Sequence, residues 1–250
     1  MNTRPIALIT GGSRGIGAAT AIVLAEQGWD IAVSYRVEAA TAMNVAQACR
    51  SAGGRAIAMR CDVADAYQID AMFDTVDREL GVLRALINNA GVVDVAQRVD
   101  EFSVERLQRM LMINVVGSFL CAGHAVRRMS TRHGGTGGVI VNVGSAASRL
   151  GSPGEYVDYA ASKAAIDTMT VGLSKEVATE GIRVNCVRPG IIETEIHASG
   201  GQPDRATEKA PLIPMQRPGQ AYEVATAIAW MCSDDASYTT GALLDVSGGR

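Results

Sequence analysis

The sequence predicts a single α/β domain, a doubly wound parallel sheet of about seven strands with helices on both faces. Short apolar runs of strand length alternate with longer amphipathic stretches along all 250 residues. Such regular alternation is typical of βαβ units, in which a helix crosses over between parallel strands. No repeat, low-complexity segment or composition shift marks a boundary, so one domain spanning residues 1–250 is the economical interpretation.

The first half of the chain contains four of the expected strands. Apolar runs place them at residues 6–10, 30–35, 55–60 and 83–88. Helices are expected between them at residues 15–27, 38–52 and 65–80. Gly28 and the pair Gly53-Gly54 are good helix stops. Asp65, with Gln68 three residues later, predicts the amino-terminal cap of the third helix.

The second half begins with a long helix at residues 103–131 and a glycine-rich loop at 133–138. A strand at 139–143, a helix at 156–180 and a strand at 182–187 follow, and Gly181 ends that helix. A less regular stretch with several prolines comes next. A helix at 221–231 and a short strand at 242–246 complete the pattern.

The composition excludes several classes of protein. Apolar residues make up 48% of the chain and charged residues 20%, which suits a folded core and not a disordered chain. The longest apolar runs are strand-sized, and the first five residues lack the anatomy of a signal peptide, so no membrane association is expected. A net charge of −3 without a basic stripe disfavours nucleic-acid binding. The five cysteines and three histidines are scattered, which predicts no metal site and free thiols in a cytoplasmic protein.

A glycine-rich turn follows the first expected strand, in the sequence Thr10-Gly11-Gly12-Ser13-Arg14-Gly15-Ile16-Gly17. At a strand-to-helix turn such glycines permit a tight turn, close approach to a pyrophosphate and close packing of the helix. The free N–H groups and positive dipole of the helix start then favour a phosphate. No Lys-Ser or Lys-Thr follows the glycines, which disfavours nucleoside triphosphate chemistry.

The spacing of these glycines resembles the TGxxxGxG motif of the short-chain dehydrogenase/reductase family. Three further matches extend the resemblance over nearly the whole chain: Asn88-Asn89-Ala90-Gly91, Tyr159-x-x-x-Lys163 and Pro189-Gly190. It implies a Rossmann fold and an oxidoreductase that uses a nicotinamide cofactor. Members similar to this chain include ketoacyl reductases and glucose dehydrogenases.

The end of the second strand bears on which nicotinamide cofactor is preferred. An acidic residue there accepts hydrogen bonds from a free ribose hydroxyl and favours NAD. Here the position is Tyr35, and Arg36 follows it. Arg14 in the glycine turn is a second cation within possible reach, and two guanidiniums suit a 2′-phosphate. We therefore predict a preference for NADP(H), with NAD(H) possible.

The remaining cofactor contacts follow from the resemblance. Asp62 resembles the aspartate that binds the adenine amino group, and Asn88 is expected to tie strands together rather than touch the cofactor. The full predicted set is Gly11, Ser13, Arg14, Ile16, Gly17, Tyr35, Arg36, Asp62, Val63, Asn89, Ala90, Gly91, Tyr159, Lys163, Pro189, Gly190, Ile192 and Thr194.

Tyr159 and Lys163 are the strongest candidates for acid–base chemistry. Residues four apart share a helix face, and a neighbouring ammonium favours the phenolate over a phenol whose ordinary pKa is near 10. Of the six tyrosines, only Tyr159 has a lysine or arginine four residues later. The sequence therefore predicts that Lys163 lowers the pKa of Tyr159, which exchanges a proton with the substrate oxygen.

Two further residues complete the predicted catalytic set. Ser145 follows the strand at 139–143 and resembles the family serine that polarises the substrate carbonyl; Ser148 is a less favoured neighbour. Many members have serine where Gly144 stands here. Asn114 lies inside the long helix, where asparagine is a mediocre helix former. The resemblance implies that Asn114 marks a helix irregularity and holds a water that relays protons to Lys163.

A mobile substrate lid is expected at about residues 193–216, because the stretch combines Gly200-Gly201 with several prolines. Its mixture of His197, Gln202 and apolar side chains does not discriminate between small-molecule substrates. The family resemblance also implies a homotetramer, or a homodimer, with the last strand at a subunit boundary.

Three alternatives remain. One is an NAD-dependent sugar or polyol dehydrogenase. Another is an epimerase or dehydratase acting on nucleotide sugars, although such relatives are usually longer. The third is a non-catalytic NADP-binding regulatory protein, which would normally lack Ser145, Tyr159 or Lys163.

Overall fold

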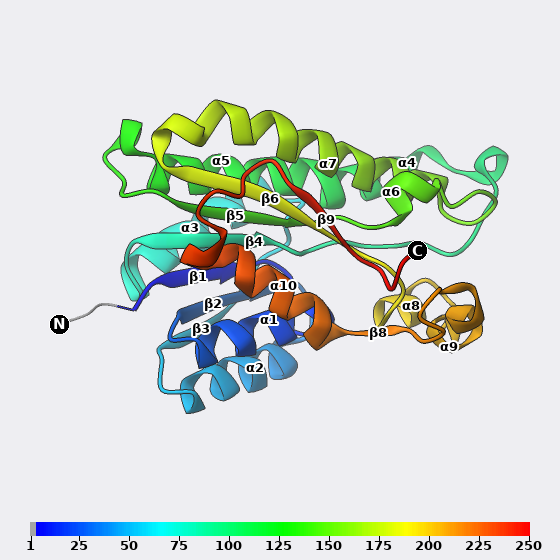
Figure 1. Ribbon diagram of the computed structural model, residues 1–250, viewed down its shortest axis with the longest axis horizontal. Coiled ribbons are helices and arrows are strands. Elements are labelled where there is room, and N and C mark those ends of the chain that lie inside the picture. The colour runs from blue at the N-terminus through cyan, green and yellow to red at the C-terminus, as the bar shows by residue number, and fades with distance from the viewer. Residues whose placement is uncertain (1–3) are drawn as a thin grey trace.

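Seven parallel strands form the sheet at the centre of the molecule, as the sequence predicts (Figure 1). The computed structural model describes residues 4–250; the first three residues, on which part of the signal-peptide expectation rests, lie outside this range. Neighbouring strands follow the order β3-β2-β1-β4-β5-β6-β9. The strands are β1 (Ile6–Ile9), β2 (Asp30–Tyr35), β3 (Ala56–Arg60), β4 (Leu83–Asn88), β5 (Gly138–Val143), β6 (Ile182–Pro189) and β9 (Leu243–Val246).

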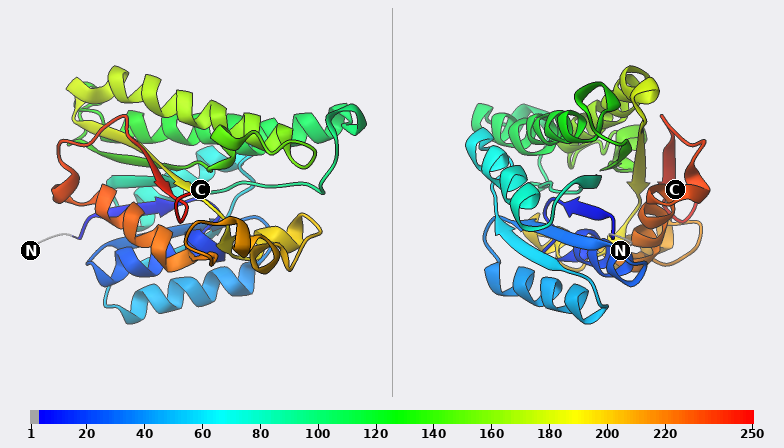
Figure 2. Two further views of the ribbon diagram at one scale, coloured as in Figure 1. Left: turned by 45° about the vertical axis from the view of Figure 1, so that its right-hand side comes forward. Right: turned by 90° about the vertical axis from the view of Figure 1, so that its left-hand side faces the viewer.

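Helices cover both faces of this sheet (Figures 1 and 2). One layer contains α1 (Gly15–Glu26), α2 (Ala39–Ser51) and α10 (Ala221–Cys232). The other contains α3 (Ala66–Glu79), α4 (Val104–Leu111), α5 (Gly117–Met129) and α7 (Val157–Val177). Each layer buries its own apolar cluster against the strands, with Ile9, Val33 and Ile228 on the first face and Leu8, Phe73 and Ile140 on the second. All five cysteines are buried and free, as expected.

The strand order places a ligand crevice next to β1. The chain winds outward from β1 to β2 and β3, returns to β4 on the other side of β1, and then continues to β5, β6 and β9. At such a reversal the loops that follow the two central strands part in opposite directions, which leaves a crevice at their carboxyl ends. The glycine turn after β1 and the Asn89-Ala90-Gly91 turn after β4 therefore lie side by side at this crevice.

Most predicted elements lie within one or two residues of their observed bounds, and local chemistry accounts for the agreement. Asp65 caps α3 by accepting hydrogen bonds from the backbone N–H groups of Tyr67 and Gln68 at 2.9 and 3.2 Å. Asn88 donates to Asn142 on the neighbouring strand at 3.0 Å and to the Ser118 carbonyl at 3.2 Å. The prediction that Asn88 ties strands together is thus confirmed.

The long helix expected at 103–131 is not uniform. One turn of π-helix, Met112–Val116, separates α4 from α5, and it contains Asn114. The predicted irregularity at Asn114 is therefore confirmed.

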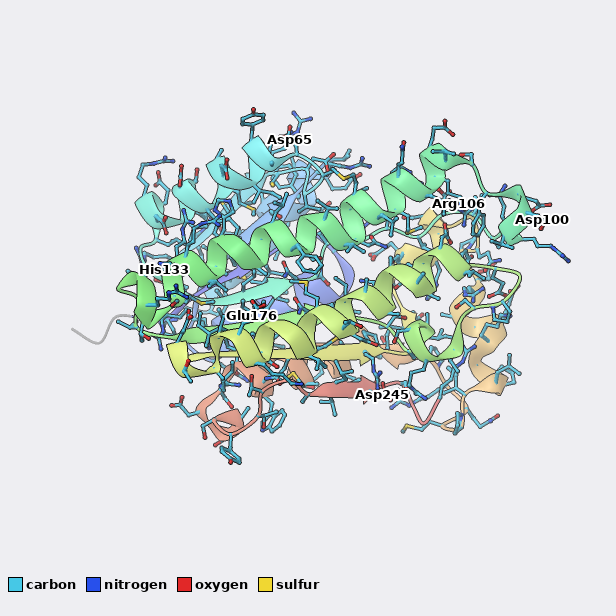
Figure 3. All side chains as sticks on the ribbon, turned by 90° about the horizontal axis from the view of Figure 1, so that it is seen from above. Asp65, Asp100, Arg106, His133, Glu176 and Asp245 are labelled. Atoms are coloured by element: carbon cyan, nitrogen blue, oxygen red, sulfur yellow. The ribbon has the colours of Figure 1, made fainter. Side chains whose placement is uncertain are left out.

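The same helix bears on the membrane expectation. By length and composition alone, Val104–Met129 is apolar enough to cross a membrane, although the sequence alone predicted no such stretch. Close to half of it is buried, because it lies on the sheet between α3 and α7 (Figure 3). We interpret it as a core helix of the layered fold.

The segment between β6 and α10 has more structure than the sequence predicted. It forms β7 (Ile192–Glu193), α8 (Ile196–Ser199), α9 (Arg205–Lys209) and β8 (Gly219–Gln220), with β7 and β8 paired in parallel. A short helix α6 (Ala147–Leu150), also not predicted, follows β5. Elements of two to five residues are too short to produce a recognisable hydrophobic period. We call residues 193–216 the lid.

Candidate active site

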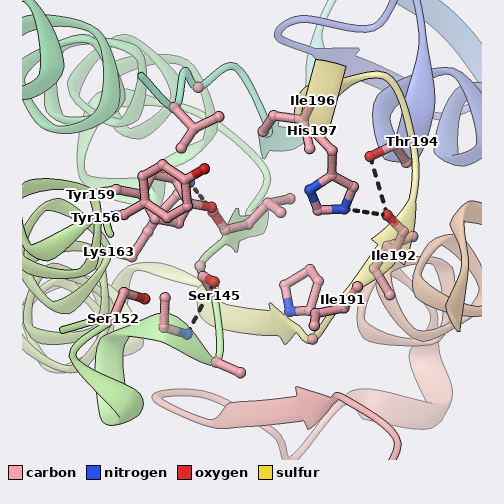
Figure 4. A pocket seen from close by; sticks show the side chains of 18 of the residues that line it. Ser145, Ser152, Tyr156, Tyr159, Lys163, Ile191, Ile192, Thr194, Ile196 and His197 are labelled. Atoms are coloured by element: carbon pink, nitrogen blue, oxygen red, sulfur yellow. Dashed lines mark hydrogen bonds between the residues drawn. The ribbon is translucent and has the colours of Figure 1, made fainter. Parts of the chain in front are cut away.

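Two adjoining cavities follow the carboxyl edge of the sheet. They share five lining residues: Ile16, Asn89, Gly91, Thr194 and Ile196. Ser145, Tyr159 and Lys163 line one of them, called here the catalytic cavity (Figure 4). Arg14, Arg36 and Asp62 line the other, called here the adenosine cavity. The residues that the sequence singled out from distant motifs therefore meet along one continuous cleft.

Close contacts explain why glycine stands in the turn after β1. Gly11 has φ +62°, and a methyl group there would lie 3.0 Å from Ala90 Cα. A methyl group on Gly17 would lie only 2.5 Å from Asn89 Nδ2 and 2.6 Å from the Gly11 carbonyl oxygen. Asn89 Nδ2 donates to the Thr10 and Gly11 carbonyls at 2.9 Å each. Gly17 therefore permits close packing of the helix, as predicted. Its tightest contacts are with Asn89 in the turn after β4 and with Gly11 in its own turn. Because no side chain caps α1, its first N–H groups suit an anionic ligand.

The adenosine cavity contains the two predicted cations. Arg36 is 57% exposed, and its Nη1 lies 4.0 Å from Asp62 Oδ2. Arg14 reaches across to the lid and donates to Ser199 Oγ at 3.3 Å. The other oxygen of Asp62, Oδ1, accepts from the Ala64 N–H at 3.0 Å. Tyr35 and Val63 line the same cavity, so the predicted adenosine residues are brought together.

Lys163 is buried beneath the catalytic cavity. It is 5% exposed, and its Nζ donates to the Val143 carbonyl at 2.8 Å. Nζ lies 5.8 Å from the centre of the Tyr159 ring, as expected for residues one turn apart on α7. Burial lowers the pKa of Lys163 to about 8, against smaller opposing effects of Cys186 and Asp167.

Tyr159 departs from the electrostatic expectation. Burial raises the pKa of its phenol above the usual value, and a hydrogen bond with the Ser145 side chain opposes this. The prediction that Lys163 lowers this pKa is therefore not confirmed, because the net shift is upward and burial outweighs every other cause. Ser145 Oγ accepts from the Ala147 N–H at 3.1 Å, which leaves its own proton to donate.

Asn114 occupies the π-helical turn and is 1% exposed. Its Oδ1 accepts from the Val92 N–H at 2.8 Å, and its Nδ2 donates to the Val92 carbonyl and to Ser162 Oγ at 3.0 Å each. A methyl group on Gly91 would lie 3.4 Å from Asn114 Oδ1 and 3.5 Å from Lys163 Nζ. Asn114 thus approaches Lys163 across Gly91, and the water relay between the two stays a prediction.

The lid side of the cleft is formed by the segment after β6. Pro189, Gly190, Ile192 and Thr194 line the catalytic cavity, and Thr194 also lines the adenosine cavity. Gly190 packs so closely on the C-terminal segment that a methyl group there would lie 2.7 Å from Ser247 Cα.

Gly144 stands where many members of the family have serine. A methyl group on Gly144 would lie 2.7 Å from Cys186 Sγ. The Cys186 side chain, on the neighbouring strand β6, therefore fills the space that a serine side chain would need.

Two groups of ion-paired residues next to the catalytic cavity were not predicted from the sequence. Arg106 of α4 forms a buried ion pair with Asp158, with Nε donating to Oδ2 at 2.7 Å. Asp158 Oδ1 in turn accepts from the Tyr159 N–H at 2.9 Å. The only available signal was the acidic residue next to Tyr159, since 52 residues separate the two partners.

A second group that escaped is a latch between the lid and the loop before α7. Arg205 and Lys209 of α9 pair with Glu155 at 2.6 and 3.2 Å. The Arg205 guanidinium also stacks 5.0 Å from the centre of the buried Tyr156 ring. Hydrogen bonding to Arg205 is the main reason that the pKa of Glu155 is lowered. We call Glu155, Arg205 and Lys209 the lid latch.

Comparison with known proteins agrees with this geometry. Residues 11–250 match the family described as "Enoyl-(Acyl carrier protein) reductase". The chain is 56% identical over 245 residues to "Uncharacterized oxidoreductase YgfF" of Escherichia coli (strain K12), covering 98% of this chain and 99% of that protein. It is 34% identical to "Glucose 1-dehydrogenase 2" of Bacillus subtilis (strain 168), covering 99% and 95%. The crystal structure of a short chain dehydrogenase from Burkholderia cenocepacia J2315 in complex with NADP superposes with a TM-score of 0.90 at 32% identity, covering 100% and 99%. The chain is therefore an oxidoreductase that belongs to the short-chain dehydrogenase/reductase family.

Proposed function

We propose that this protein transfers hydride between NADP(H) and a carbonyl or alcohol substrate, with Tyr159 as the general acid and base. The observation that carries the proposal is the meeting of Ser145, Tyr159 and Lys163 in one cavity that continues into the cavity of Arg14 and Arg36. A site for acid–base chemistry and a site for a dinucleotide phosphate thus lie next to each other.

Each residue of the catalytic cavity has a distinct proposed role. Ser145 donates a hydrogen bond that orients the substrate carbonyl, since its oxygen is already occupied by the Ala147 N–H. Tyr159 is protonated at neutral pH because its pKa is raised, so it can give a proton to the substrate oxygen during reduction. The reduced nicotinamide, when bound, supplies the hydride.

Lys163 and Asn114, both buried, are proposed to assist the proton transfer by Tyr159. The ammonium of Lys163 is held at the Val143 carbonyl and faces the Tyr159 ring. We propose that it binds the nicotinamide ribose and, with cofactor in place, favours the phenolate. Asn114 is fixed by hydrogen bonds from two neighbouring segments and is proposed to hold the water that returns the proton to Lys163.

The adenosine cavity supports a preference for NADP(H). The side chain at the end of β2 is Tyr35, and both nearby cations, Arg14 and Arg36, line this cavity. The Asp62 carboxylate lies 4.0 Å from the Arg36 guanidinium, so a phosphate bound by Arg36 would share that guanidinium with Asp62. Apart from Gly17, the other residues of the predicted cofactor set line one or both of these cavities.

The experiment that tests the proposal follows absorbance of the reduced nicotinamide with ketones, aldehydes, sugars and polyols, using each cofactor in turn. We expect turnover with NADPH and tighter binding of NADPH than of NADH. Arg36→Ala should weaken NADPH binding by roughly 10-fold or more, since it removes a hydrogen bond to a charged group, and should leave NADH binding nearly unchanged. Arg78→Ala, at an exposed position on α3, is the control.

Tighter binding of NADH would overturn the assignment of NADP(H). Oxidation of sugars with NAD would favour instead the sugar or polyol dehydrogenase alternative, which similarity to "Glucose 1-dehydrogenase 2" keeps in view. Cofactor binding with no turnover on any substrate would favour the regulatory alternative.

We further propose a homotetramer acting in the cytoplasm. Apolar side chains on α4 and α5 remain exposed, among them Leu111 at 46% and Phe119 at 51%. Leu244 on β9, at the edge of the sheet, is 37% exposed. A second copy would cover these side chains, and light scattering of the purified protein measures its mass directly.

A further inference from the structure

His197 is the feature of the catalytic cavity that the proposed mechanism does not use. It belongs to α8 in the lid and lines the same cavity as Ser145 and Tyr159. Figure 4 shows its ring on the opposite side of the cavity from Tyr159 and Lys163. A substrate whose carbonyl is held by Ser145 and Tyr159 would therefore have this ring across the cavity from it.

One ring nitrogen of His197 is already committed. Nε2 lies 2.9 Å from the Ile192 carbonyl oxygen. A carbonyl oxygen can only accept a hydrogen bond, so Nε2 carries the proton of the neutral imidazole. Burial is the main reason that the pKa of His197 is lowered; the hydrogen bond to the Ile192 carbonyl opposes this shift, and the positive charge of Arg205 adds a smaller lowering. The ring is therefore neutral at pH 7.

The other ring nitrogen, Nδ1, is then an acceptor with a free lone pair. Within residues 4–250, Nδ1 has no hydrogen-bond partner, and Figure 4 shows it on the side of the ring that faces Tyr156 and Tyr159. The neighbouring side chains Ile191 and Ile196 are apolar and offer it no donor.

Arg205, whose charge acts on the His197 ring, does not compete for the same role. Arg205 is held by Glu155 at 2.6 Å and by Gln202 at 2.6 Å. Nδ1 of His197 is therefore an unpaired acceptor on the lid side of the cavity, with the apolar side chains of Ile191 and Ile196 beside it. An acceptor in such a place favours ligands that bring a donor and disfavours ligands that leave it unpaired.

We propose that His197 is a specificity-determining residue whose Nδ1 accepts a hydrogen bond from a hydroxyl group of the substrate, so that the preferred substrates are hydroxylated carbonyl compounds and the corresponding diols. The inference rests on the proposed function, because it assumes that the reacting carbonyl lies at Ser145 and Tyr159. It predicts rejection of analogues in which an ether or a second carbonyl replaces the hydroxyl, since these groups only accept.

The test compares kcat/KM for 1-hydroxy-2-butanone and 4-hydroxy-2-butanone with their methyl ethers and with 2-butanone, using NADPH. The methyl ethers keep the oxygen and lose only the donor. We expect the wild-type protein to prefer at least one hydroxyketone over its ether and over 2-butanone by roughly 10- to 100-fold, the range for an unpaired polar group.

Two variants assign this preference to His197. His197→Leu removes the acceptor and should abolish the preference by reducing kcat/KM for the hydroxyketone while retaining that for 2-butanone. His197→Asn keeps an acceptor oxygen near the position of Nδ1 and should restore part of the preference. The control is His133→Leu, an exposed position at the far end of the helix layer from Arg106 (Figure 3).

The outcomes separate this inference from the function on which it rests. If the wild-type protein reduces ketones without distinguishing hydroxyl from ether, or if His197→Leu keeps the full preference, the inference is overturned and the proposed function stands. If the wild-type protein reduces no substrate with either cofactor, the proposed function fails and the inference fails with it. Should His197→Leu not fold, as a thermal melt would reveal, the wild-type ranking and His197→Asn still decide.

Discussion

The two sides of the catalytic cavity are held in place in different ways. On the side of α7, Lys163, Asn114 and Asp158 are at most 6% exposed, and each is bound by other buried groups. On the lid side, short elements are fastened by the lid latch, in which Glu155 and Lys209 are each 30% exposed. Groups that move protons need fixed positions, whereas groups that select a substrate can vary with the loop that carries them. In the proposed function, chemistry and selectivity therefore rest on separate parts of the fold.

The α7 side depends on one buried ion pair in particular. The side chains of Arg106 and Asp158 are 6% and 1% exposed. Arg106 also donates to the Val95 carbonyl and to Gln97, at 2.7 Å each. The pair therefore joins α4, the loop at 95–97 and the first turn of α7, next to Tyr159.

The largest effect should come from removing the acid on the α7 side. Tyr159→Phe is expected to reduce kcat by roughly 10²- to 10⁴-fold, because general acid–base catalysis contributes about that much. NADPH affinity, measured by fluorescence titration, should change little. Tyr156→Phe, which removes the other phenol hydroxyl of this cavity, should lose far less activity. Equal losses in the two variants would contradict the assignment of the acid to Tyr159.

The next effect sharpens the contrast in stability. Arg106→Leu leaves the Asp158 charge buried without its partner, which should lower the free energy of unfolding by about 3–5 kcal/mol. Arg98→Ala breaks an exposed pair with Asp100, with side chains 77% and 65% exposed, and should cost about 0–1 kcal/mol. Urea denaturation measures both. A loss below about 1 kcal/mol for Arg106→Leu would contradict a rigid α7 side.

The free energy of unfolding should also depend on pH in a different range for each side, through Lys163 on the α7 side and His197 on the lid side. The pKa of Lys163 falls from 10.5 to about 8 on folding, so between these values the unfolded chain binds more protons. The Lys163 contribution to the free energy of unfolding therefore rises with pH over that window, and Lys163→Met should remove the rise. The lowered pKa of His197 makes its contribution fall as pH drops below 6.5, a fall that His197→Asn should remove. Denaturation of the wild type and the variants at several pH values tests both. A difference in free energy of unfolding between wild type and variant that stays constant across pH would contradict the expectation.

The smallest effect belongs to the lid latch. Glu155→Gln removes the charge that Arg205 and Lys209 share, and partly exposed pairs are worth about 1 kcal/mol or less. Global stability should hardly change, while amides of α9 exchange faster with solvent and KM rises a few-fold at unchanged kcat. A large loss of global stability would mean that the lid is as firmly built as α7.

The same contrast explains how far the sequence could predict the molecule. The helical irregularity at Asn114 was implied by the family resemblance. Strands such as β2 and β4 follow from apolar runs, and the cap of α3 follows from Asp65. These signals are local. The pairing of Arg106 with Asp158 and the latch of Glu155 with α9 join segments about 50 residues apart, and the sequence carries no period or motif for them. The raised pKa of Tyr159 is likewise a property of packing, since its main cause is burial.

The contact between Gly190 and Ser247 has a practical consequence. The end of the chain lies against the floor of the active site, where Arg250 lines the catalytic cavity and its carbonyl accepts hydrogen bonds from Arg149 and Ser247 at 2.7 and 2.9 Å. A purification tag fused after Arg250 would begin at the catalytic cavity, and we expect it to interfere with substrate binding there. Attachment ahead of β1 keeps the added peptide away from the cleft, because Ile6 is at the amino-terminal end of a central strand and the cleft follows the carboxyl ends of the parallel strands.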